Sequence, residues 1–491
     1  MHPRKLVRDS LGLALSHYVS RFVLLGRGIA AAAALGPLTF GVWNALNLLF
    51  DYGGYASCGA LQGLDVKLPP EAARGDEARA QQLMRGAWSV VLVGGLLFAI
   101  ATVLYLASGH RLIAAPWGWG APLLMLVAAL VQLVIHYHLS VLRAYDEFQT
   151  ASTAQALQAV LGGGLGLALV WRLGVWGLLG GWLVGGIVAL LWLRRGRRAP
   201  PIKPGLPADG LGLVRIGFPI FGYFTASLVL RSVDRIAFVR YAGTEGLGQY
   251  SLGLMAAGLI LFLPEAASTV LVPRVSAAAH GARDLERTRA EVRQTHRALA
   301  VLLPTMVALG MVWAGPITGW LLPAFVAGIP ALRFLALGAL LLATATLPGY
   351  FVMASGKAPR LFAVGAAAAI LTAALVFSVA ARDHRPASIA LAASCGYGVF
   401  ALGLVTLAAP GLCANAGERL AFTVLSFVPA LWGAGLALAA CAVGHGETVG
   451  AALVRSLAIL AGYLPVLWWF GRGAGLRRLA HEWLSGRVAP A

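Results

Sequence analysis

The sequence predicts an all-α, polytopic membrane protein with about 14 transmembrane helices. Three observations predict it: an apolar composition, a series of long apolar runs, and basic residues gathered in alternate connections. Hydrophobic residues make up 59% of the 491 residues and charged residues only 12%, with a mean hydropathy of +0.79. Because a soluble domain has roughly a quarter charged residues, this composition excludes an ordinary soluble protein.

A membrane-spanning helix needs about 20 apolar residues. The runs of this length predict fourteen helices, at 10–34, 40–64, 86–107, 120–142, 151–171, 174–193, 218–239, 247–272, 298–322, 329–353, 361–380, 389–409, 420–441 and 449–470. The first run is not read as a signal peptide, because Arg21 and Arg27 interrupt it and the apolar region of a signal is uncharged. We expect it to be retained as the first helix.

The distribution of basic residues predicts the orientation. With the N-terminus in the cytoplasm, 27 of the 38 Lys and Arg residues fall in inner segments, five in outer loops and six within the predicted helices. Inner loops of membrane proteins carry such an excess, so we expect both termini to be cytoplasmic. Topology thus accounts for the net charge of +19, and no nucleic-acid partner is expected.

Two stretches suggest an internal repeat. In "ALGPLTFGVW" (34–43) and "YAGTEGLGQY" (241–250), Gly36 and Gly41 match Gly243 and Gly248 in spacing. After the next helix, "LPPEAARGDEARAQQLMR" (68–85) matches 272–297 in having a Pro and then a charged amphipathic stretch. Repeats six helices apart predict two pseudo-symmetric six-helix bundles related by an axis along the membrane normal, an arrangement typical of transporters.

The repeat predicts the domain organisation. We expect an N-terminal six-helix bundle at 1–193, a basic cytoplasmic linker at 194–217, a second six-helix bundle at 218–409, and helices 13 and 14 with a cytoplasmic amphipathic tail at 410–491. In a transporter of this kind the substrate lies between the two bundles, near the membrane midplane.

Three motifs resemble a known family: "LGPLTFGVW" after the first helix, "LRAYDEFQTASTAQALQAVL" (142–161), and "DRIAFVRYAGTEGLGQYSL" between helices 7 and 8. With the 6 + 6 + 2 helix arrangement, they make nearly the whole chain resemble the polysaccharide flippases of the multidrug/oligosaccharidyl-lipid/polysaccharide exporter superfamily. Relatives often have an Arg shortly before the Leu-Gly-Pro turn, where this chain has Ala33 and Ala34, and Arg27 lies earlier.

The resemblance implies a function. It implies movement of a polyprenyl-pyrophosphate-linked oligosaccharide across the bacterial inner membrane by alternating access, for O-antigen, capsule or exopolysaccharide assembly. The partners implied are this lipid-linked substrate and membrane lipid, with polysaccharide polymerase machinery as a further candidate.

Charged residues in the seventh predicted helix are candidate binding residues. Arg231, Asp234 and Arg235 are spaced to share one helix face. One Asp cannot neutralise two Arg, so this face would stay positive and suit a pyrophosphate. The alternative is structural: these side chains reach the outer interface near Arg240 or lock the helix to a neighbour.

The first two predicted helices supply further candidates for the binding site. Arg21 lies near the centre of its helix, with Arg27 on an adjoining face, and the second helix carries a polar stripe of Asn44, Asn47 and Asp51. Arg and amide groups can hydrogen-bond phosphate oxygens and sugar hydroxyls. The alternatives are interhelical hydrogen bonds for the amides and a buried Arg21–Asp51 pair.

Three residues are candidates for ion coupling: His17, His136 and Glu265. A histidine can titrate during a proton-coupled cycle, and Glu265 follows Pro264, where a helix break would expose backbone carbonyls. The alternatives are core histidines and a solvated Glu beside a kink. The four cysteines have no metal-ligand spacing, and we expect no metal, no cofactor and no catalytic residues.

Two other functions predict features that this sequence does not favour. A small-molecule exporter of the same superfamily would have acidic residues in its lumen, whereas intramembrane basic residues outnumber Asp51, Asp234 and Glu265. A polysaccharide polymerase or ligase would have a long outer loop with catalytic groups, and the longest outer loops expected here have about a dozen residues. The flippase interpretation is therefore preferred, with its driving force left open.

Overall fold

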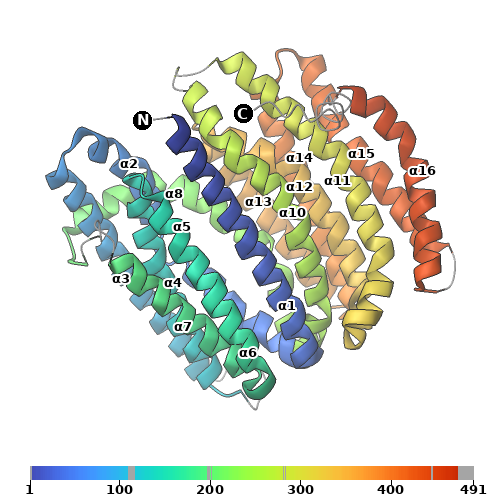
Figure 1. Ribbon diagram of the computed structural model, residues 1–491, viewed down its shortest axis with the longest axis horizontal. Helices are drawn as coiled ribbons and strands as arrows, with labels where there is room; N and C mark the ends of the chain where they lie inside the picture. The colour runs from blue at the N-terminus through green and yellow to red at the C-terminus, as the bar shows by residue number, and fades with distance from the viewer. Residues whose placement is uncertain are drawn as a thin grey trace. The chain divides into compact units, whose positions relative to one another are not determined.

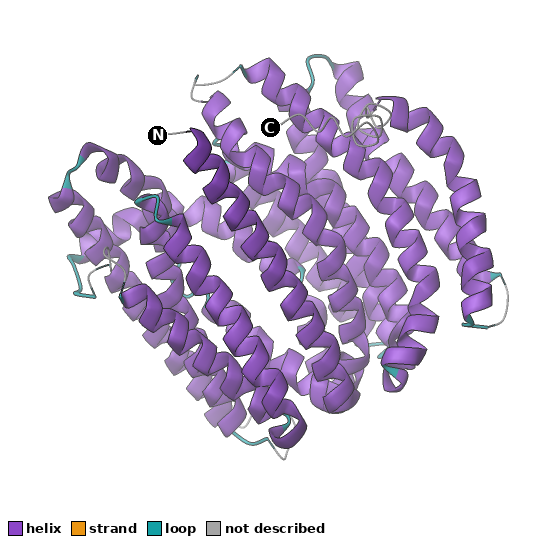
Figure 2. Cartoon of the chain, in the orientation of Figure 1, coloured by secondary structure: helices purple, strands orange, loops and turns teal. Residues whose placement is uncertain are grey.

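The computed structural model of the chain describes residues 3–108, 117–195, 200, 202–279, 281, 284–443 and 446–473, and for residues 3–25, 270 and 471–473 it describes the backbone alone. Within this part of the chain, every regular element is a helix (Figure 2). The predicted all-α fold is confirmed. The predicted amphipathic tail after residue 473 falls outside the described residues.

Contacts between residues divide the chain into two compact units, Met1–Gly248 (unit 1) and Gln249–Ala491 (unit 2). The predicted halves at 1–193 and 218–409 are defined by the sequence repeat rather than by contacts, and they stay a prediction.

Unit 1 contains the first nine α-helices and the start of the tenth (Figure 1). Helix α1 packs against α4, α5 and α6, and α2 packs against α3, α4 and α8. The elements are α1 (Pro3–Gly53), α2 (Ala60–Arg74), α3 (Glu77–Ala107), α4 (Gly120–Ala144), α5 (Phe148–Leu157), the π-helix η1 (Gln158–Gly162), α6 (Gly163–Leu173), α7 (Val175–Arg194), α8 (Pro207–Leu230), α9 (Val233–Ala237), the π-helix η2 (Phe238–Ala242) and α10 (Gly243–Ala279).

Unit 2 contains most of α10 and the remaining helices. Helix α14 packs against α12 and α13, and α11 packs against α12, α15 and α16. The elements are α11 (Leu285–Leu321), the 3₁₀ helix η3 (Pro323–Gly328), α12 (Ile329–Ala354), α13 (Ala358–Ala380), α14 (Pro386–Leu412), α15 (Ala416–Ala442) and α16 (Val449–Gly473).

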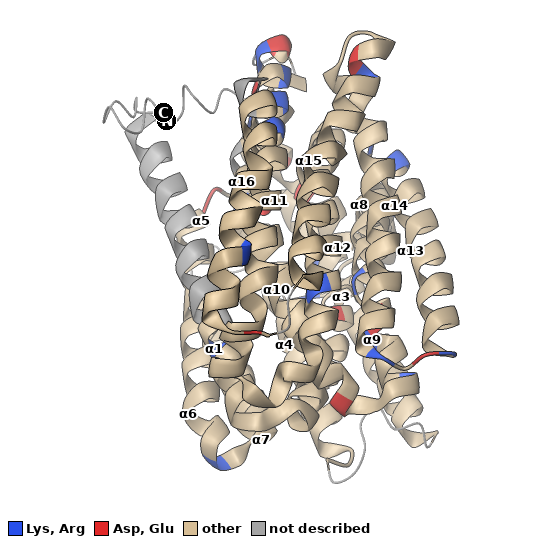
Figure 3. Ribbon diagram, turned by 90° about the vertical axis from the view of Figure 1, so that its right-hand side faces the viewer, with Lys and Arg blue, Asp and Glu red and all other residues tan. Residues whose placement is uncertain are grey.

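The described residues hold 13 helices that are long and apolar enough to cross a membrane. Long stretches of these helices carry no charged residue (Figure 3), and α3 exposes large apolar side chains along its length, including Leu92, Leu96, Leu97 and Leu104. Helices that hydrogen-bond all their backbone internally and present apolar side chains outward suit a bilayer. The chain is a multi-pass membrane protein.

The predicted helix at 10–34 and the first part of that at 40–64 are joined in α1, which is helical on both sides of a bend at Gly36. The predicted helix at 40–64 is wrong at its end, because α1 stops at Gly53 and residues 60–64 begin α2. The backbone of Gly36 has φ 69° and ψ 172°, and that of Gly243, at the start of α10, has φ 75° and ψ −180°. Side chains are strained at positive φ, and glycine is not. The two turns matched in the sequence therefore have the same backbone conformation.

The two turns also pack against each other reciprocally. A Cβ atom added to Gly41 would collide with the carbonyl oxygen of Thr244, and one added to Gly248 would collide with that of Pro37. The offset that relates Gly36 to Gly243 also relates Pro37 to Thr244 and Gly41 to Gly248. Such an exchange of contacts is what a local twofold axis produces.

The seventh predicted helix, 218–239, is wrong at both ends. Helix α8 begins at Pro207, inside the predicted linker 194–217, because a proline fits the first turn of a helix and Asp209 places a negative charge near its N-terminus. It ends at Leu230, and Arg231 and Ser232 form a turn before the short α9.

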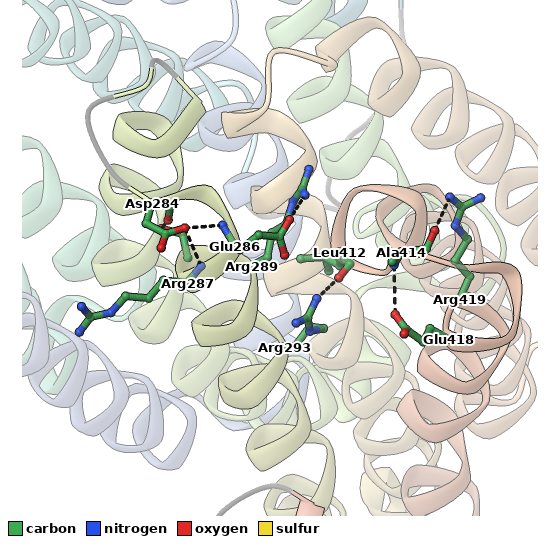
Figure 4. Close-up of polar contacts among 10 residues, drawn as sticks. Asp284, Glu286, Arg287, Arg289, Arg293, Leu412, Ala414, Glu418 and Arg419 are labelled. Carbon is green, nitrogen blue, oxygen red and sulfur yellow. Dashed lines mark hydrogen bonds and ion pairs between the residues drawn. The ribbon is translucent and has the colours of Figure 1, made fainter.

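In unit 2 the basic stretch 273–297 becomes the end of α10 and the first turns of α11. The carboxylate of Asp284 caps α11 by accepting from the backbone N–H groups of Glu286 (2.9 Å) and Arg287 (3.2 Å). Arg293 donates to the carbonyl oxygen of Leu412 at the end of α14 (Figure 4). The N-terminal end of α11 is thus capped by Asp284 and held against the α14–α15 connection by Arg293.

The reciprocal contact between the turns predicts how adding one methyl group at Gly248 changes the stability of the protein. Gly248→Ala should lower the stability of the protein by about 1–3 kcal/mol, the usual cost of overpacking, because its Cβ would meet the Pro37 backbone. The matched control is Gly258→Ala on the same helix, where no atom lies within 4 Å of the added Cβ. Thermal unfolding in detergent measures both, and an equal midpoint for the two variants would contradict the contact.

Candidate functional site

The break between α8 and α9 places the charged residues of this segment in different positions. Arg231 follows the last residue of α8, is exposed, and donates from Nε to the carbonyl of Ser227 (3.4 Å). Asp234 and Arg235 follow in α9; Asp234 is buried and accepts the backbone N–H of Arg235 (2.7 Å). The expected single helix face that carries all three is therefore wrong.

An ion pair joins α9 to α1. The guanidinium of Arg235 donates from one terminal nitrogen to the Asp51 carboxylate at 3.0 Å, with 12% of the Arg235 side chain and 34% of the Asp51 side chain exposed. One residue further along α1, the hydroxyl of Tyr52 lies 2.7 Å from that of Ser232. Two polar contacts thus hold the end of α1 on the α8–α9 break, and Arg235 supplies the partner of Asp51 that was weighed for Arg21.

The expected excess of positive charge at this break is also wrong. Arg235 pairs with Asp51 of α1, so two carboxylates, Asp51 and buried Asp234, accompany the two arginines of this segment. Burying an ion away from water is costly unless it is paired, so this pairing stabilises the charges inside the membrane.

The contact between the α1–α2 segment and the α8–α9 segment continues away from the ion pair; we call the whole contact the seam. Tyr55 lies against Phe221, with ring centroids 6.2 Å apart. Further along, Cβ atoms added to Gly59 or Gly63 would meet the backbone of Gly217 or Leu213, so the two segments approach at backbone distance. The seam is polar at one end and closely packed at the other.

Arg27 lies in a separate place on α1. Its guanidinium carbon is 4.9 Å from the ring centroid of Trp43 and 4.8 Å from that of Trp182 on α7. Among the described groups, its buried Nη2 has no hydrogen-bond acceptor. Arginine is attracted to the faces of aromatic rings, and an unsatisfied buried donor is costly. The Arg27 side chain is therefore held in place by the two rings, and its Nη2 group remains an unused hydrogen-bond donor in the described part of the chain.

The amides of the predicted polar stripe bond within α1. Asn44 donates to the carbonyl of Phe40 and Asn47 to that of Trp43, both at 2.9 Å. Both side chains are half-buried. These bonds use the amide nitrogens.

His136 belongs to a polar chain within the first helices. It lies 3.0 Å from Gln132, whose side-chain oxygen accepts from Gln158 (2.6 Å), and it hydrogen-bonds the backbone of Gly54. The last contact lies at the start of the break between α1 and α2.

The remaining candidates are His17, Arg21 and Glu265. His17 and Arg21 belong to the part of α1 whose side chains fall outside the description. Glu265 is half-buried in unit 2, and α10 is helical through Pro264 and Glu265, so the helix break considered there beside a kink does not occur. Among the described residues, no group of three or more His, Cys, Asp or Glu is placed to hold a metal ion.

Four residues of these clusters were missed by the sequence analysis: Tyr52, Ser232, Trp43 and Trp182. Ser232 lies between two of the predicted charged residues. The serine in this charged stretch was therefore a signal that the helix breaks here, rather than that the charged residues share one face of a continuous helix. The tryptophans had no signal, because an aromatic residue in an apolar run usually packs against lipid or core.

The fold and part of the sequence match known proteins. Residues 66–279 match the family model described as "Polysaccharide biosynthesis protein". The structure of the lipid II flippase MurJ in an inward closed conformation matches with a TM-score of 0.70 and 15% identity, over 94% of this chain and 99% of that one. The chain shares the fold of this solved flippase structure. The predicted resemblance is thereby confirmed.

Two further solved structures also match this chain over most of its length. An inward-facing multidrug resistance MATE family transporter has a TM-score of 0.59 and 16% identity, covering 83% of this chain and 96% of that one. A superfamily transporter from Pyrococcus furiosus, whose binding pocket is described as of reverse polarity, has a TM-score of 0.58 and 16% identity, covering 85% and 95%. These proteins are transporters and flippases, not enzymes. No curated protein has a significant sequence match to this chain.

The Asp51–Arg235 pair predicts energetic coupling between α1 and α9. Asp51→Asn and Arg235→Gln should each destabilise the protein, and the double variant should be more stable than the sum of the two losses by about 1–2 kcal/mol. Thermal or denaturant unfolding of all four proteins measures this coupling. Arg240→Gln is the control, because Arg240 is exposed beyond the seam. Additive losses for Asp51→Asn and Arg235→Gln would contradict the pair.

Proposed function

We propose that this chain is a flippase that moves polyprenyl-pyrophosphate-linked oligosaccharides from the cytoplasmic to the periplasmic leaflet by alternating access. The proposal places it in the bacterial inner membrane with both termini in the cytoplasm, in the assembly of O-antigen, capsule or exopolysaccharide. The observation that carries it is the match of residues 66–279 to the polysaccharide biosynthesis family, in a chain with a transporter fold.

The proposed headgroup site centres on Arg27. A phosphate is best recognised by a guanidinium, which donates two parallel hydrogen bonds, and Arg27 has a buried donor without an acceptor among the described residues. Arg21 precedes it on α1 by six positions and is proposed to add charge. The side-chain oxygens of Asn44 and Asn47 are proposed to accept hydrogen bonds from sugar hydroxyls.

The residues of the seam have a different role in the proposal. Asp51 and Arg235 neutralise each other, so they are proposed to close the seam rather than to bind phosphate. Arg231 and Asp234 flank the same break and are proposed to shift when the seam opens. In an alternating-access cycle, the contact between α1 and α9 would break in one state and form in the other.

The proposed cycle needs a driving force other than ATP hydrolysis, since the sequence carries no nucleotide-binding loop. His17, His136 and Glu265 stay candidates for coupling to an ion gradient. Of these, His136 is supported most directly, because its hydrogen bonds join α4 to the α1–α2 break, and protonation would change them. Polysaccharide polymerase machinery stays a candidate partner.

A small-molecule exporter is the second candidate function. The fold shared with MATE transporters favours it, as does the presence of Asp51 and Asp234 in unit 1, because carboxylates suit cationic substrates. Uptake of organic cations into inverted vesicles, in the absence of lipid-linked sugar transport, would support this candidate over the flippase.

A flipping assay with one charge variant tests the proposal. In proteoliposomes, the wild type should move a polyprenyl-pyrophosphate-linked oligosaccharide to the opposite leaflet, and Arg27→Gln should slow this movement at least about tenfold, the typical worth of a charge-assisted hydrogen bond. The measurement is the accessibility of the glycan to an added lectin or glycosidase at matched protein amounts.

Arg240→Gln removes an equal charge at an exposed position and should transport like the wild type. Normal transport by Arg27→Gln would remove Arg27 from the headgroup site. A wild type that moves no lipid-linked oligosaccharide, tested with substrates of its own host, would contradict the flippase proposal.

A further inference from the structure

The two tryptophans around Arg27 hold the guanidinium in a particular way. Trp43 and Trp182 both lie within 5 Å of its central carbon, at 4.9 Å and 4.8 Å from their ring centroids. In a contact of this kind each ring face attracts the positive charge of the guanidinium. Its N–H donors point outward in the plane, so aromatic contacts consume none of them.

Both rings are braced by other parts of unit 1. Trp43 is buried in α1, beyond the bend at Gly36 that separates it from Arg27. Trp182 meets Phe50 edge-on, with ring centroids 5.7 Å apart, and packs against the backbone of Gly162. Three elements, the two arms of α1 and the helix α7, therefore fix the position of one cation.

The position of the guanidinium leaves a donor unused. Nη2 of Arg27 is buried and, among the described residues, meets no acceptor, although the side chain as a whole is only half-buried. A cation that served only to join helices would be expected to spend its buried donors on a carboxylate or a carbonyl, because each unsatisfied donor costs free energy. A donor that is fixed but unused indicates an acceptor that arrives with a ligand.

We propose that Trp43 and Trp182 are positioning residues that hold Arg27 by its faces and reserve its in-plane donors for two oxygens of a pyrophosphate headgroup. This inference rests on the proposed function and names its specificity element. A planar guanidinium held in one orientation can donate to oxygens on two adjacent phosphates at once. A freely rotating cation attracts any phosphate by charge alone. The tryptophans therefore set the preference for a pyrophosphate over a monophosphate.

Equilibrium binding tests the inference separately from transport. The probes are polyprenyl pyrophosphate and polyprenyl monophosphate, both without sugar, titrated into the full chain in nanodiscs. Wild type should bind the pyrophosphate more tightly. Trp182→Leu should weaken pyrophosphate binding about 5–30-fold, the worth of a desolvated cation–π contact, with little effect on the monophosphate. Trp182→Phe keeps an aromatic face and should lose no more than about threefold.

Two further variants keep the test decisive. Trp192→Leu removes an exposed tryptophan from the same helix and should bind like the wild type. Arg27→Lys keeps the charge without the planar fork, so it should lose the preference for the pyrophosphate even if Trp182→Leu fails to fold.

The outcomes separate the two proposals. The positioning role is overturned if Trp182→Leu or Arg27→Lys keeps the wild-type preference for the pyrophosphate over the monophosphate. It is also overturned if Trp182→Leu and Trp182→Phe lose the same amount of pyrophosphate affinity. No binding of polyprenyl pyrophosphate by the wild type also overturns it. Wild type that binds with the expected pattern but moves no lipid-linked oligosaccharide supports the positioning role and overturns the proposed function.

Discussion

Unit 1 depends on the close contact between the turns at Gly36 and Gly243. Each turn is followed, five residues later, by a glycine that touches the other turn through its backbone. This contact sets where the second arm of α1 meets the segment that leads into α10. The ion pair and the Tyr52–Ser232 hydrogen bond join these same two segments, and the glycine packing continues the seam between the start of α2 and α8. A side chain at Gly41 or Gly248 would collide with the facing backbone and weaken this contact.

The membrane imposes the second constraint, which is that polar groups must find partners within the protein. The described charges of unit 1 meet this constraint in two ways. Asp51 and Arg235 neutralise each other across helices, and Asp234 accepts a backbone N–H at the start of α9. Arg27 is instead placed between aromatic faces, with no carboxylate in an ion pair with it among the described residues. This difference separates charges that hold the seam from a charge available to a ligand.

The sequence predicted most of the fold because apolar length and glycine positions act locally. Apart from those at 10–34, 40–64 and 218–239, the eleven other predicted helices begin or end within a few residues of helices in the structure, and the repeat predicted the two turns that share a backbone conformation. The break at Arg231 and Ser232 was missed because no glycine or proline marks it. The partner of Asp51 was missed because the pair joins residues 184 positions apart, and a single sequence gives no register between distant helices.

The site was predictable only as a set of residue types. Asp51, Arg27 and Arg235 were selected because ionisable residues are rare in apolar runs, and all three do make specific contacts. Their grouping was wrong, since a continuous helix was assumed where the chain breaks. The tryptophan contacts of Arg27 join residues 16 and 155 positions away, which composition and spacing do not reveal.

The central claim is that the seam opens and closes during transport. The most direct test replaces Tyr52 and Ser232 with cysteine in a chain whose four native cysteines are alanine. A bis-methanethiosulfonate reagent about as long as the tyrosine side chain then links the two positions. The matched control links Asp65→Cys to Ser140→Cys, where the native side chains are 2.6 Å apart within the first helices.

If the seam must open, linked Tyr52→Cys/Ser232→Cys protein should lose transport of the lipid-linked oligosaccharide and regain it on reduction, while the linked control keeps its activity. Full transport by the linked seam variant would contradict the account.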